Sequence, residues 1–494
     1  MVTFAATQSR IASNFLVAGV LSFCSLPVGG VADESPTVEP PPIATPPTSG
    51  AVTHSSDLIT RLEQLERQNA EFAEQHALLT NQLDALTNQF DVLNQQSCSG
   101  CQYDHERGAV LLVPGWEEHP FELRADFFTQ TRYTNFGRNT ESFMESTGLR
   151  MPVRNFDSIE INRNFINFSG YALDPRLQFT AMVFSSTSLD DTLYLGWINY
   201  RFSEALDVRV GNWQLPGTRE WYESFRFTLG TERLMATTFF RPNVSPGIWI
   251  QGVFFENLRY VAMLANSTNR LGRSADQLGT ARAFSGTVWW EPTGDFGRGP
   301  SDIECHAAPS LRLGASTTLA KESNQGFGNP EAGNPEDTIL RLTDGTPLFR
   351  FGALAPGVQL LSTRFNLWAI DAAVKYRGMS VAGEYFFRRL HDFQARPGQV
   401  PYKSLYDHGG LLQAGAFVLR NEVEVFARGS FVTGLFGSGH EVGGGVNWYP
   451  LGSREWRFTA EALHIDDSPA QNILTGYRAG ESGTLFKLQW FADF

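Results

Sequence analysis

The spacing of hydrophobic residues constrains the fold of this chain more than any other feature of its sequence. Between residues 120 and 494, segments of roughly ten residues alternate apolar with polar side chains, and turn-forming residues separate the segments. In the last segment, the residues on one face are Phe486, Leu488, Trp490, Ala492 and Phe494. Because successive side chains of a strand point to opposite faces of its sheet, this period of two predicts strands with one apolar and one polar face.

Sixteen segments of this kind are present, and their number indicates one large closed sheet. They cover residues 122–134, 158–171, 176–187, 192–202, 206–213, 247–256, 257–266, 281–292, 310–321, 363–377, 380–391, 410–419, 422–433, 440–449, 455–466 and 483–494. The chain is 42% hydrophobic and 18% charged, yet no apolar run is long enough to predict a membrane-spanning helix. Apolar side chains toward lipid and polar side chains toward a watery lumen give this pattern. The sequence therefore predicts an all-β domain over residues 120–494, a 16-stranded antiparallel transmembrane β-barrel.

The connections between these segments differ greatly in length. Some are as short as the pairs 174–175 and 190–191, whereas 214–246, 293–309 and 322–362 are long. Outer-membrane barrels carry short turns on one rim and long loops on the other. We therefore expect the long connections to share a rim, and we expect 214–246 to fold into the barrel, with its aromatic residues packed against the wall.

The residues that precede the barrel begin with two segments that are not expected to form a core. Arg10, an apolar stretch from Ile11 to Leu26 and small residues before Asp33 are typical of a secretory signal peptide at residues 1–32. The proline-rich residues 33–57 predict an extended linker.

Residues 58–97 predict an α-helical coiled coil that precedes the barrel. From Leu58 to Leu93 the seam positions recur at alternating intervals of four and three, with Asn69 and His76 at two of the inner positions. A helix that is apolar only along so narrow a seam needs partner helices, so we interpret this segment as an oligomerisation stalk.

The connector, residues 98–119, carries Cys98 and Cys101 in a CxxC arrangement. Zinc sites pair such a motif with a second one, which this sequence lacks, so we predict no metal ligand. In an exported protein we expect these cysteines to form disulfides. A local bridge and bridges between subunits are both open alternatives.

A selective pore needs fixed charges where its passage narrows. Lumen candidates are the cations on the polar phase of the strands and those in the connection 214–246. The predicted pore-lining and anion-binding residues are Arg124, Arg132, Arg163, Arg209, Arg219, Arg226, Arg233, Arg241 and Lys375. Arginine suits this role because it stays charged on burial and presents a planar donor fork to oxyanions. Acids such as Asp126, Glu384 and Glu461 fall on the same phase, so the sequence predicts a lumen of mixed sign.

Three short stretches carry a family resemblance: residues 206–220, residues 231–252 and Gly445-Val446-Asn447-Trp448-Tyr449. They resemble passages of the phosphate-selective porin O and P family of Gram-negative outer membranes. The resemblance implies a 16-stranded barrel, homotrimers, a constricted pore lined by arginine and lysine, and an N-terminal periplasmic segment that can trimerise. The chain departs from the family at residues 161–166, where several arginines are common and only Arg163 is present.

These features lead to one main hypothesis and two alternatives. The main hypothesis is a homotrimeric outer-membrane porin, with its stalk in the periplasm, that lets small anions such as phosphate diffuse passively through an arginine-lined constriction. The first alternative is a non-selective general diffusion porin of the same fold. The second is a structural tether of the cell envelope, in which the stalk contacts the cell wall and the barrel is the anchor.

Other functional classes are not favoured by the sequence. The net charge of −13 argues against nucleic acid as a partner. The sequence has no nucleophile-elbow, zinc-protease or P-loop motif, so we predict no enzyme activity, no catalytic residue and no cofactor. The expected partners are further copies of the chain, outer-membrane lipid and small anions.

Overall fold

The computed structural model describes residues 67, 70, 101–104, 108–112, 120–188, 191–268, 282–323, 340–396 and 398–494. The predicted signal peptide (1–32), linker (33–57) and Cys98 lie outside the described residues. Of the predicted stalk (58–97), the structure describes only Arg67 and Ala70, which are helical. In the described part of the chain, no helix has both the length and the apolar character needed to cross a membrane.

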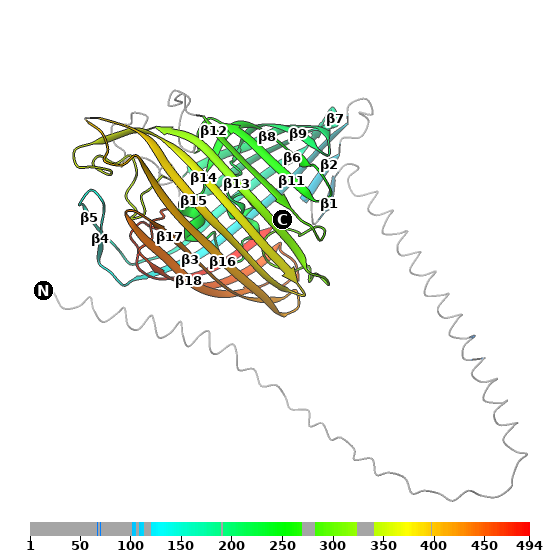
Figure 1. The fold of residues 1–494 in the computed structure, drawn as a ribbon. Helices are drawn as coiled ribbons and strands as arrows, with labels where there is room; N and C mark the ends of the chain where they lie inside the picture. The colour runs from blue at the N-terminus through cyan, green and yellow to red at the C-terminus, as the bar shows by residue number, and fades with distance from the viewer. Residues whose placement is uncertain are drawn as a thin grey trace, which may run out of the picture. The chain divides into compact units, whose positions relative to one another are not determined.

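The chain divides into two units, Met1–Asn94 and Gln95–Phe494, and the second unit contains a closed antiparallel β-barrel. Each strand of the barrel pairs with the next (Figure 1). The last strand pairs with the first, with Phe486 opposite Asn135. The sixteen barrel strands among the described residues are β3 (Phe121–Arg138), β6 (Phe156–Ala172), β7 (Asp174–Ser186), β8 (Asp191–Ser203), β9 (Leu206–Gln214), β10 (Val244–Val253), β11 (Leu258–Ala265), β12 (Ala283–Trp290), β13 (Ser310–Ser323), β14 (Gln359–Tyr376), β15 (Met379–Arg396), β16 (Ser404–Leu419), β17 (Val423–Gly434), β18 (Gly437–Trp448), β19 (Trp456–Asp466) and β20 (Gly483–Asp493). Each predicted segment corresponds to one of them, so the prediction of a 16-stranded antiparallel barrel is confirmed.

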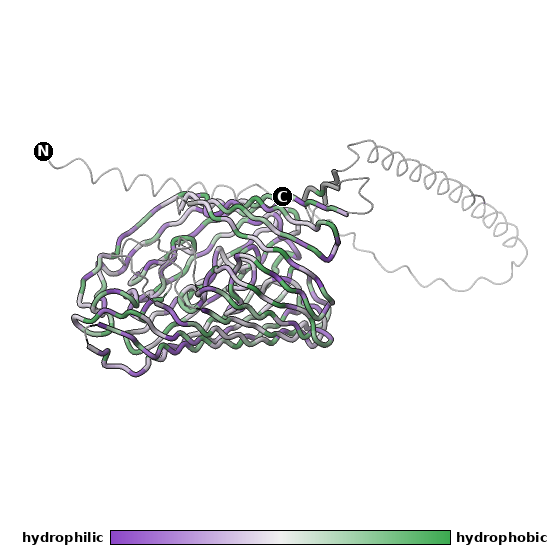
Figure 2. Tube along the Cα trace, turned by 90° about the horizontal axis from the view of Figure 1, so that it is seen from above, coloured by the Kyte–Doolittle hydropathy of each residue, from purple (hydrophilic) through white to green (hydrophobic). Residues whose placement is uncertain are grey.

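The alternation of side chains along the strands sets the two faces of the barrel wall. On β14, Ile370 is 64% exposed on the outer face, whereas its neighbour Asp371 is 7% exposed and points inward. Figure 2 shows hydrophobic and hydrophilic residues alternating along the strands. An apolar outer face and a polar inner face are the arrangement that a barrel in lipid requires.

A short hairpin extends the wall at the point where the barrel closes. β20 pairs with β3 only from Phe128 onward, which leaves the first residues of β3 without a partner from β20. β2 (Gly108–Leu112) pairs with that free edge and β1 (Cys101–Asp104) pairs with β2. The connector predicted at residues 98–119 therefore contains two strands, because an open strand edge is a strong template for pairing.

The positions of two connections contradict the prediction that all long loops share a rim. The connection 293–309 lies at the same rim as the short turn between β6 and β7, and the short connection between β7 and β8 lies at the same rim as the loop after β9. Part of the connection 293–309 turns into the lumen. Phe296 and Asp302 are fully buried, because this connection folds into the lumen. At the opposite rim, the connection between β3 and β6 forms its own hairpin, β4 (Ser142–Met144) with β5 (Arg150–Pro152).

Candidate functional site: a constriction inside the barrel

The connection between β9 and β10 folds into the barrel, as the sequence predicts. We call residues 215–243 the constriction loop. It contains a short helix α3 (Arg219–Tyr222), a 3-10 turn η2 (Phe225–Phe227) and a helix α4 (Met235–Phe240). Leu215, Leu229 and Leu234 are fully buried, although they belong to a loop. A loop with this much buried apolar surface is held as firmly as a small core.

Buried carboxylates of the barrel wall anchor the backbone of the constriction loop. Glu384 on β15 accepts hydrogen bonds from the backbone N–H groups of Arg219 (2.6 Å) and Glu220 (3.1 Å). Glu461 on β19 accepts one from the backbone N–H of Thr231 at 3.1 Å. These acids satisfy backbone donors that would otherwise be buried without a partner. They are therefore committed to holding the loop and do not act as free charges in the lumen.

An ion pair and aromatic packing complete this anchored side of the loop. The Nε of Arg428 on β17 lies 2.5 Å from a carboxylate oxygen of Glu461, and both side chains are fully buried. Arg428 also donates to the backbone carbonyl of Glu232 in the loop. The rings of Phe240 and Phe386 stack with centroids 5.2 Å apart. Together these contacts hold the constriction loop against strands β15 to β19.

Removing one member of the buried pair is expected to destabilise the barrel strongly. The Glu461→Ala substitution leaves the Arg428 guanidinium buried without its carboxylate, which costs about 3–5 kcal/mol. The double variant Arg428→Met/Glu461→Leu does not leave a charge of this pair without its partner. We expect its loss of unfolding free energy to be less than half that of Glu461→Ala. Each variant is refolded into lipid vesicles and unfolded with guanidinium chloride, which measures its loss of unfolding free energy relative to the wild type. Equal losses in the two variants would show that the cost does not come from leaving the Arg428 charge unpaired.

The opposite side of the loop faces a cavity of ≈ 490 Å³. We call it the constriction cavity, and its other wall consists of strands β6 to β9. Among the described residues its lining contains six arginines and no aspartate or glutamate: Arg163, Arg209, Arg226, Arg233, Arg241 and Arg298. Its aromatic lining residues are Phe165, Phe184, Trp197, Trp213, Trp221, Tyr222, Phe225 and Phe227. The anchored acids and the cavity thus lie on opposite sides of one loop.

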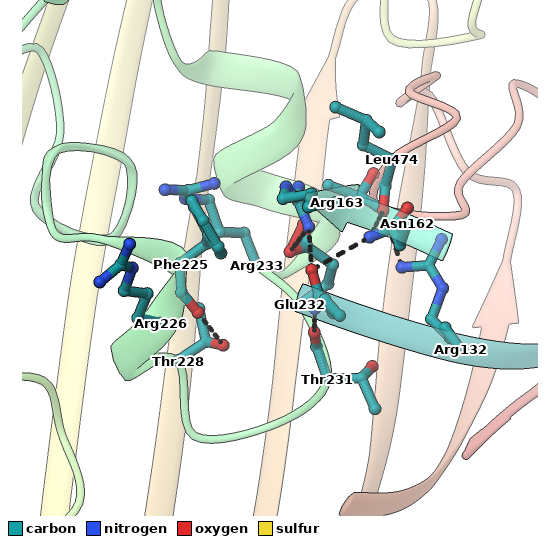
Figure 3. Close-up of polar contacts among 12 residues, drawn as sticks. Arg132, Asn162, Arg163, Phe225, Arg226, Thr228, Thr231, Glu232, Arg233 and Leu474 are labelled. Carbon is teal, nitrogen blue, oxygen red and sulfur yellow. Dashed lines mark hydrogen bonds and ion pairs between the residues drawn. The ribbon is translucent and has the colours of Figure 1, made fainter. Parts of the chain in front are cut away.

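Two of the arginines are paired with carboxylates. Figure 3 shows Arg163 of β6 beside Glu232 of the loop. The two side chains form a bidentate pair with N–O distances of 2.7 and 2.9 Å. Arg226 forms ion pairs with Asp126 (3.3 Å) and Asp493 (2.7 Å). These pairs fix the position of the loop and neutralise part of the positive charge.

Three further arginines of the lining, Arg209, Arg233 and Arg298, form no ion pair with a carboxylate of the described part of the chain. Arg209 lies with its guanidinium 4.1 Å from the ring centroid of Trp197. Arg233 donates to backbone carbonyls of the loop, including those of Glu220 (3.0 Å) and Glu223 (3.0 Å). Arg298 lies over the ring of Phe227 at 5.4 Å. The cavity lining therefore carries net positive charge.

Burial and neighbouring charges shift the titration of the charged groups of the loop. Burial lowers the pKa of Arg233 to about 9, and the positive charges of Arg163 and Arg241 act in the same direction. Burial also favours the neutral form of Glu232, but the Arg163 and Arg233 charges outweigh it and lower the pKa of that carboxyl. At neutral pH, Arg233 is therefore protonated and Glu232 is ionised. Burial raises the pKa of Glu220, which lies on the anchored side.

A second cavity of ≈ 920 Å³ adjoins the first toward the rim where β3 begins and β20 ends. We call it the vestibule. It shares Arg226, Phe227 and Arg298 with the lining of the constriction cavity. Its lining is mixed in sign, with Arg124 and Arg454 together with acids such as Asp295, Glu304 and Asp493. A solute moving between the two cavities would pass Arg226 and Arg298.

The structure brings together five of the nine predicted site residues. Arg163, Arg209, Arg226, Arg233 and Arg241 line the constriction cavity, and Arg124 lines the vestibule. The lumen is mixed in sign, as predicted, because arginines and acids both line the vestibule, whereas the described lining of the constriction cavity contains arginines and no acid.

Three predicted residues point into the barrel but lie outside both cavities. Arg132 pairs with Glu160 at 2.6 Å, Arg219 pairs with Glu223 at 3.0 Å, and Lys375 donates to the backbone carbonyl of Arg298 at 3.2 Å. Sequence reasoning missed Arg298, which lies in the connection 293–309. The signal that could have found it is the glycine-rich neighbourhood, where Gly297 and Gly299 adopt positive φ and turn the chain inward.

One group of side chains has the composition of a metal site. Ligand atoms of Asp302, Glu304 and His306 lie within 4.8 Å of one another. Asp302 accepts from the backbone N–H of Gly378 at 2.7 Å and contacts His306, while Glu304 pairs with Arg454. These contacts tie the connection 293–309 to the barrel wall, and they occupy the carboxylates with protein partners.

Comparisons with known proteins do not define a family for this chain. No protein-family model matches the chain, and no curated protein matches it. Membership of the phosphate-selective family therefore stays a prediction. The structure is similar to that of OmpT from Vibrio cholerae, with a TM-score of 0.47 and 11% identity over 75% of this chain and 98% of that one.

Two further solved structures are similar to the same extent. An anion-selective porin from Comamonas acidovorans has a TM-score of 0.44 and 12% identity, over 75% of this chain and 99% of that one. OmpF of Salmonella typhi, in complex with daunomycin, has a TM-score of 0.46 and 8% identity, over 76% and 98%. At such low identity the similarity concerns the architecture alone.

Proposed function

We propose that this protein is an outer-membrane channel through which small anions diffuse passively. The observation that carries the proposal is the constriction cavity, whose described lining contains six arginines and no carboxylate. Fixed positive charges in a narrow passage attract anions and repel cations, because the surrounding low-dielectric walls strengthen both effects. Passage would need no covalent chemistry, since charge-assisted hydrogen bonds from guanidinium groups can form and break as a solute moves.

The barrel itself supports the proposed location. Its outer face is apolar, β20 pairs with β3, and β2 covers the part of the β3 edge that β20 does not reach. This arrangement suits a lipid environment. We place it in the outer membrane of a Gram-negative-type bacterium, with the predicted stalk in the periplasm. Assembly as a homotrimer through residues 58–97, and contact of that stalk with the cell wall, are part of the proposal.

The reversal potential in a planar lipid bilayer tests this function. Purified protein separating two KCl solutions of different concentration should give a potential of the sign set by chloride permeation. Added phosphate should reduce the chloride current if phosphate enters the same passage. A potential near zero would favour the non-selective porin, and a potential of cationic sign would contradict the proposal.

The tether alternative has its own test. A variant that lacks residues 33–97 should keep its conductance if the barrel alone forms the channel. Loss of envelope integrity in cells carrying that variant, with conductance unchanged, would show that the stalk has a structural role beside the channel.

A further inference from the structure

The constriction cavity is apolar on one part of its wall, which a passage for inorganic ions does not require. Phe165 on β6, Phe184 on β7, and Leu193 and Leu195 on β8 all line it. The rings of Phe165 and Phe184 are 4.9 Å apart. Inward positions of a water-filled barrel are normally polar. Phe165 and Phe184 are themselves buried and pack against Phe225, so the surface that can accept an apolar part of a solute consists of the half-buried Met182 on β7 and Leu193 and Leu195 on β8.

The charged part of the same cavity is held by stacking. Arg209 lies over Trp197 at 4.1 Å, and Arg241 and Arg233 lie over Trp221 at 3.9 and 4.6 Å. A guanidinium that stacks on a ring keeps its N–H groups in its own plane, where they can donate to a carboxylate or phosphonate. Aromatic stacking and oxyanion binding are thus compatible at one arginine.

The size of the cavity favours a solute larger than an inorganic ion. Its volume is ≈ 490 Å³, within the range of pockets that hold small organic ligands. A water molecule takes up roughly 30 Å³ of liquid, so a bare phosphate ion would leave most of the cavity filled with water. An anion with an aromatic ring could contact the arginines and the apolar wall together.

We propose that the constriction cavity binds organic anions with an aromatic or comparably apolar body in preference to inorganic phosphate. This inference rests on the proposed function, because it names the class of anion that the channel takes. The oxyanion contacts the guanidinium groups of Arg209 and Arg233, and the ring lies against Met182, Leu193 and Leu195. The arginines alone, or the apolar residues alone, would not favour an aromatic anion over inorganic phosphate.

Block of the chloride current in a planar bilayer tests the inference. Phenylphosphonate, methylphosphonate and inorganic phosphate are added in turn to the full-length protein, with benzyl alcohol as a neutral aromatic control. We expect half-block by phenylphosphonate at a concentration at least about tenfold below that of either other anion, because only it buries a ring. We expect benzyl alcohol not to block, because it carries no charge.

A substitution in the apolar wall separates this preference from anion selectivity as such. Leu195→Asn should bring the half-blocking concentration of phenylphosphonate close to that of methylphosphonate and leave that of inorganic phosphate unchanged. Leu451→Asn, at an exposed turn residue (66% exposed), is the matched control and should change neither. Equal block by phenylphosphonate and phosphate in the wild type, or block by benzyl alcohol, would overturn the inference. If anion selectivity itself were missing from the reversal potential, the proposed function would fail instead.

Discussion

Replacing Arg209 by glutamate is expected to lower the ratio of chloride to potassium permeability by at least about tenfold. The substitution changes the charge of the constriction cavity by two units. At an effective dielectric constant of about 20, a unit charge roughly 8 Å from a passing ion contributes about 2 kcal/mol, and each 1.4 kcal/mol is a factor of ten. Reversal potentials of the variant and the wild type in the same KCl gradient measure the change.

Arg209 is well suited to this test because it does not hold the constriction loop in place. Its Nε donates to Asn199 on β8 at 3.3 Å, and its other described contact is the ring of Trp197. The matched control is Arg364→Glu, which reverses a charge at a position 61% exposed on the outer face of β14. A shift of similar size in both variants would mean that the effect does not come from the cavity.

Removing the constriction loop is expected to raise the single-channel conductance several-fold and to abolish anion selectivity. The two ends of the loop are already joined, since the backbone N–H of Leu215 donates to the carbonyl of Asn243 at 3.0 Å. Residues 216–242 can therefore be replaced by an Asn-Gly turn, which connects two antiparallel strands directly. The variant loses the wall that carries Arg226, Arg233 and Arg241, and the lumen widens.

Single-channel recordings measure this effect, and the shift in gel mobility on heating shows whether the variant is folded. We expect a lower melting temperature as well, because Glu384 and Glu441 lose the backbone donors that they now accept. A folded variant with the conductance and selectivity of the wild type would show that ions do not pass beside the loop.

The wall of the barrel could be predicted from the sequence because one physical rule controls it. Each strand must show apolar side chains to lipid and polar ones to the lumen, so Ile370 and Asp371 differ in the way that the period of two requires. The hairpin of β1 and β2 gave no such signal. Its strands are short, and they form because the edge of β3 extends beyond the end of β20.

The constriction was only partly predictable. Alternation tells which residues point inward but not which part of the lumen they reach. Arg209 and Glu384 both point inward, yet Arg209 lines the cavity while Glu384 anchors the loop on the other side. The connection 293–309 is long, and length alone does not tell whether a connection protrudes or folds inward. The three-dimensional paths of the constriction loop and of the connection 293–309 decide which inward-pointing arginines and acids line the cavity.

The central claim is that anions pass between the constriction loop and the wall formed by β6 to β9. Thiol accessibility tests it at two neighbouring residues of β7, in a background with all four cysteines, Cys24, Cys98, Cys101 and Cys305, replaced by serine. Thr180 lines the constriction cavity, whereas Ala181 is exposed on the outer face. The two positions differ by one residue and therefore by the side of the wall.

In this measurement, Thr180→Cys and Ala181→Cys are each treated with an anionic and a cationic methanethiosulfonate during current recording. We predict that the anionic reagent reduces the current through the Thr180→Cys channel at least about tenfold faster than the cationic one, and that neither reagent changes the current through Ala181→Cys. Faster modification of Thr180→Cys by the cationic reagent, or no effect of either reagent there, would contradict the account.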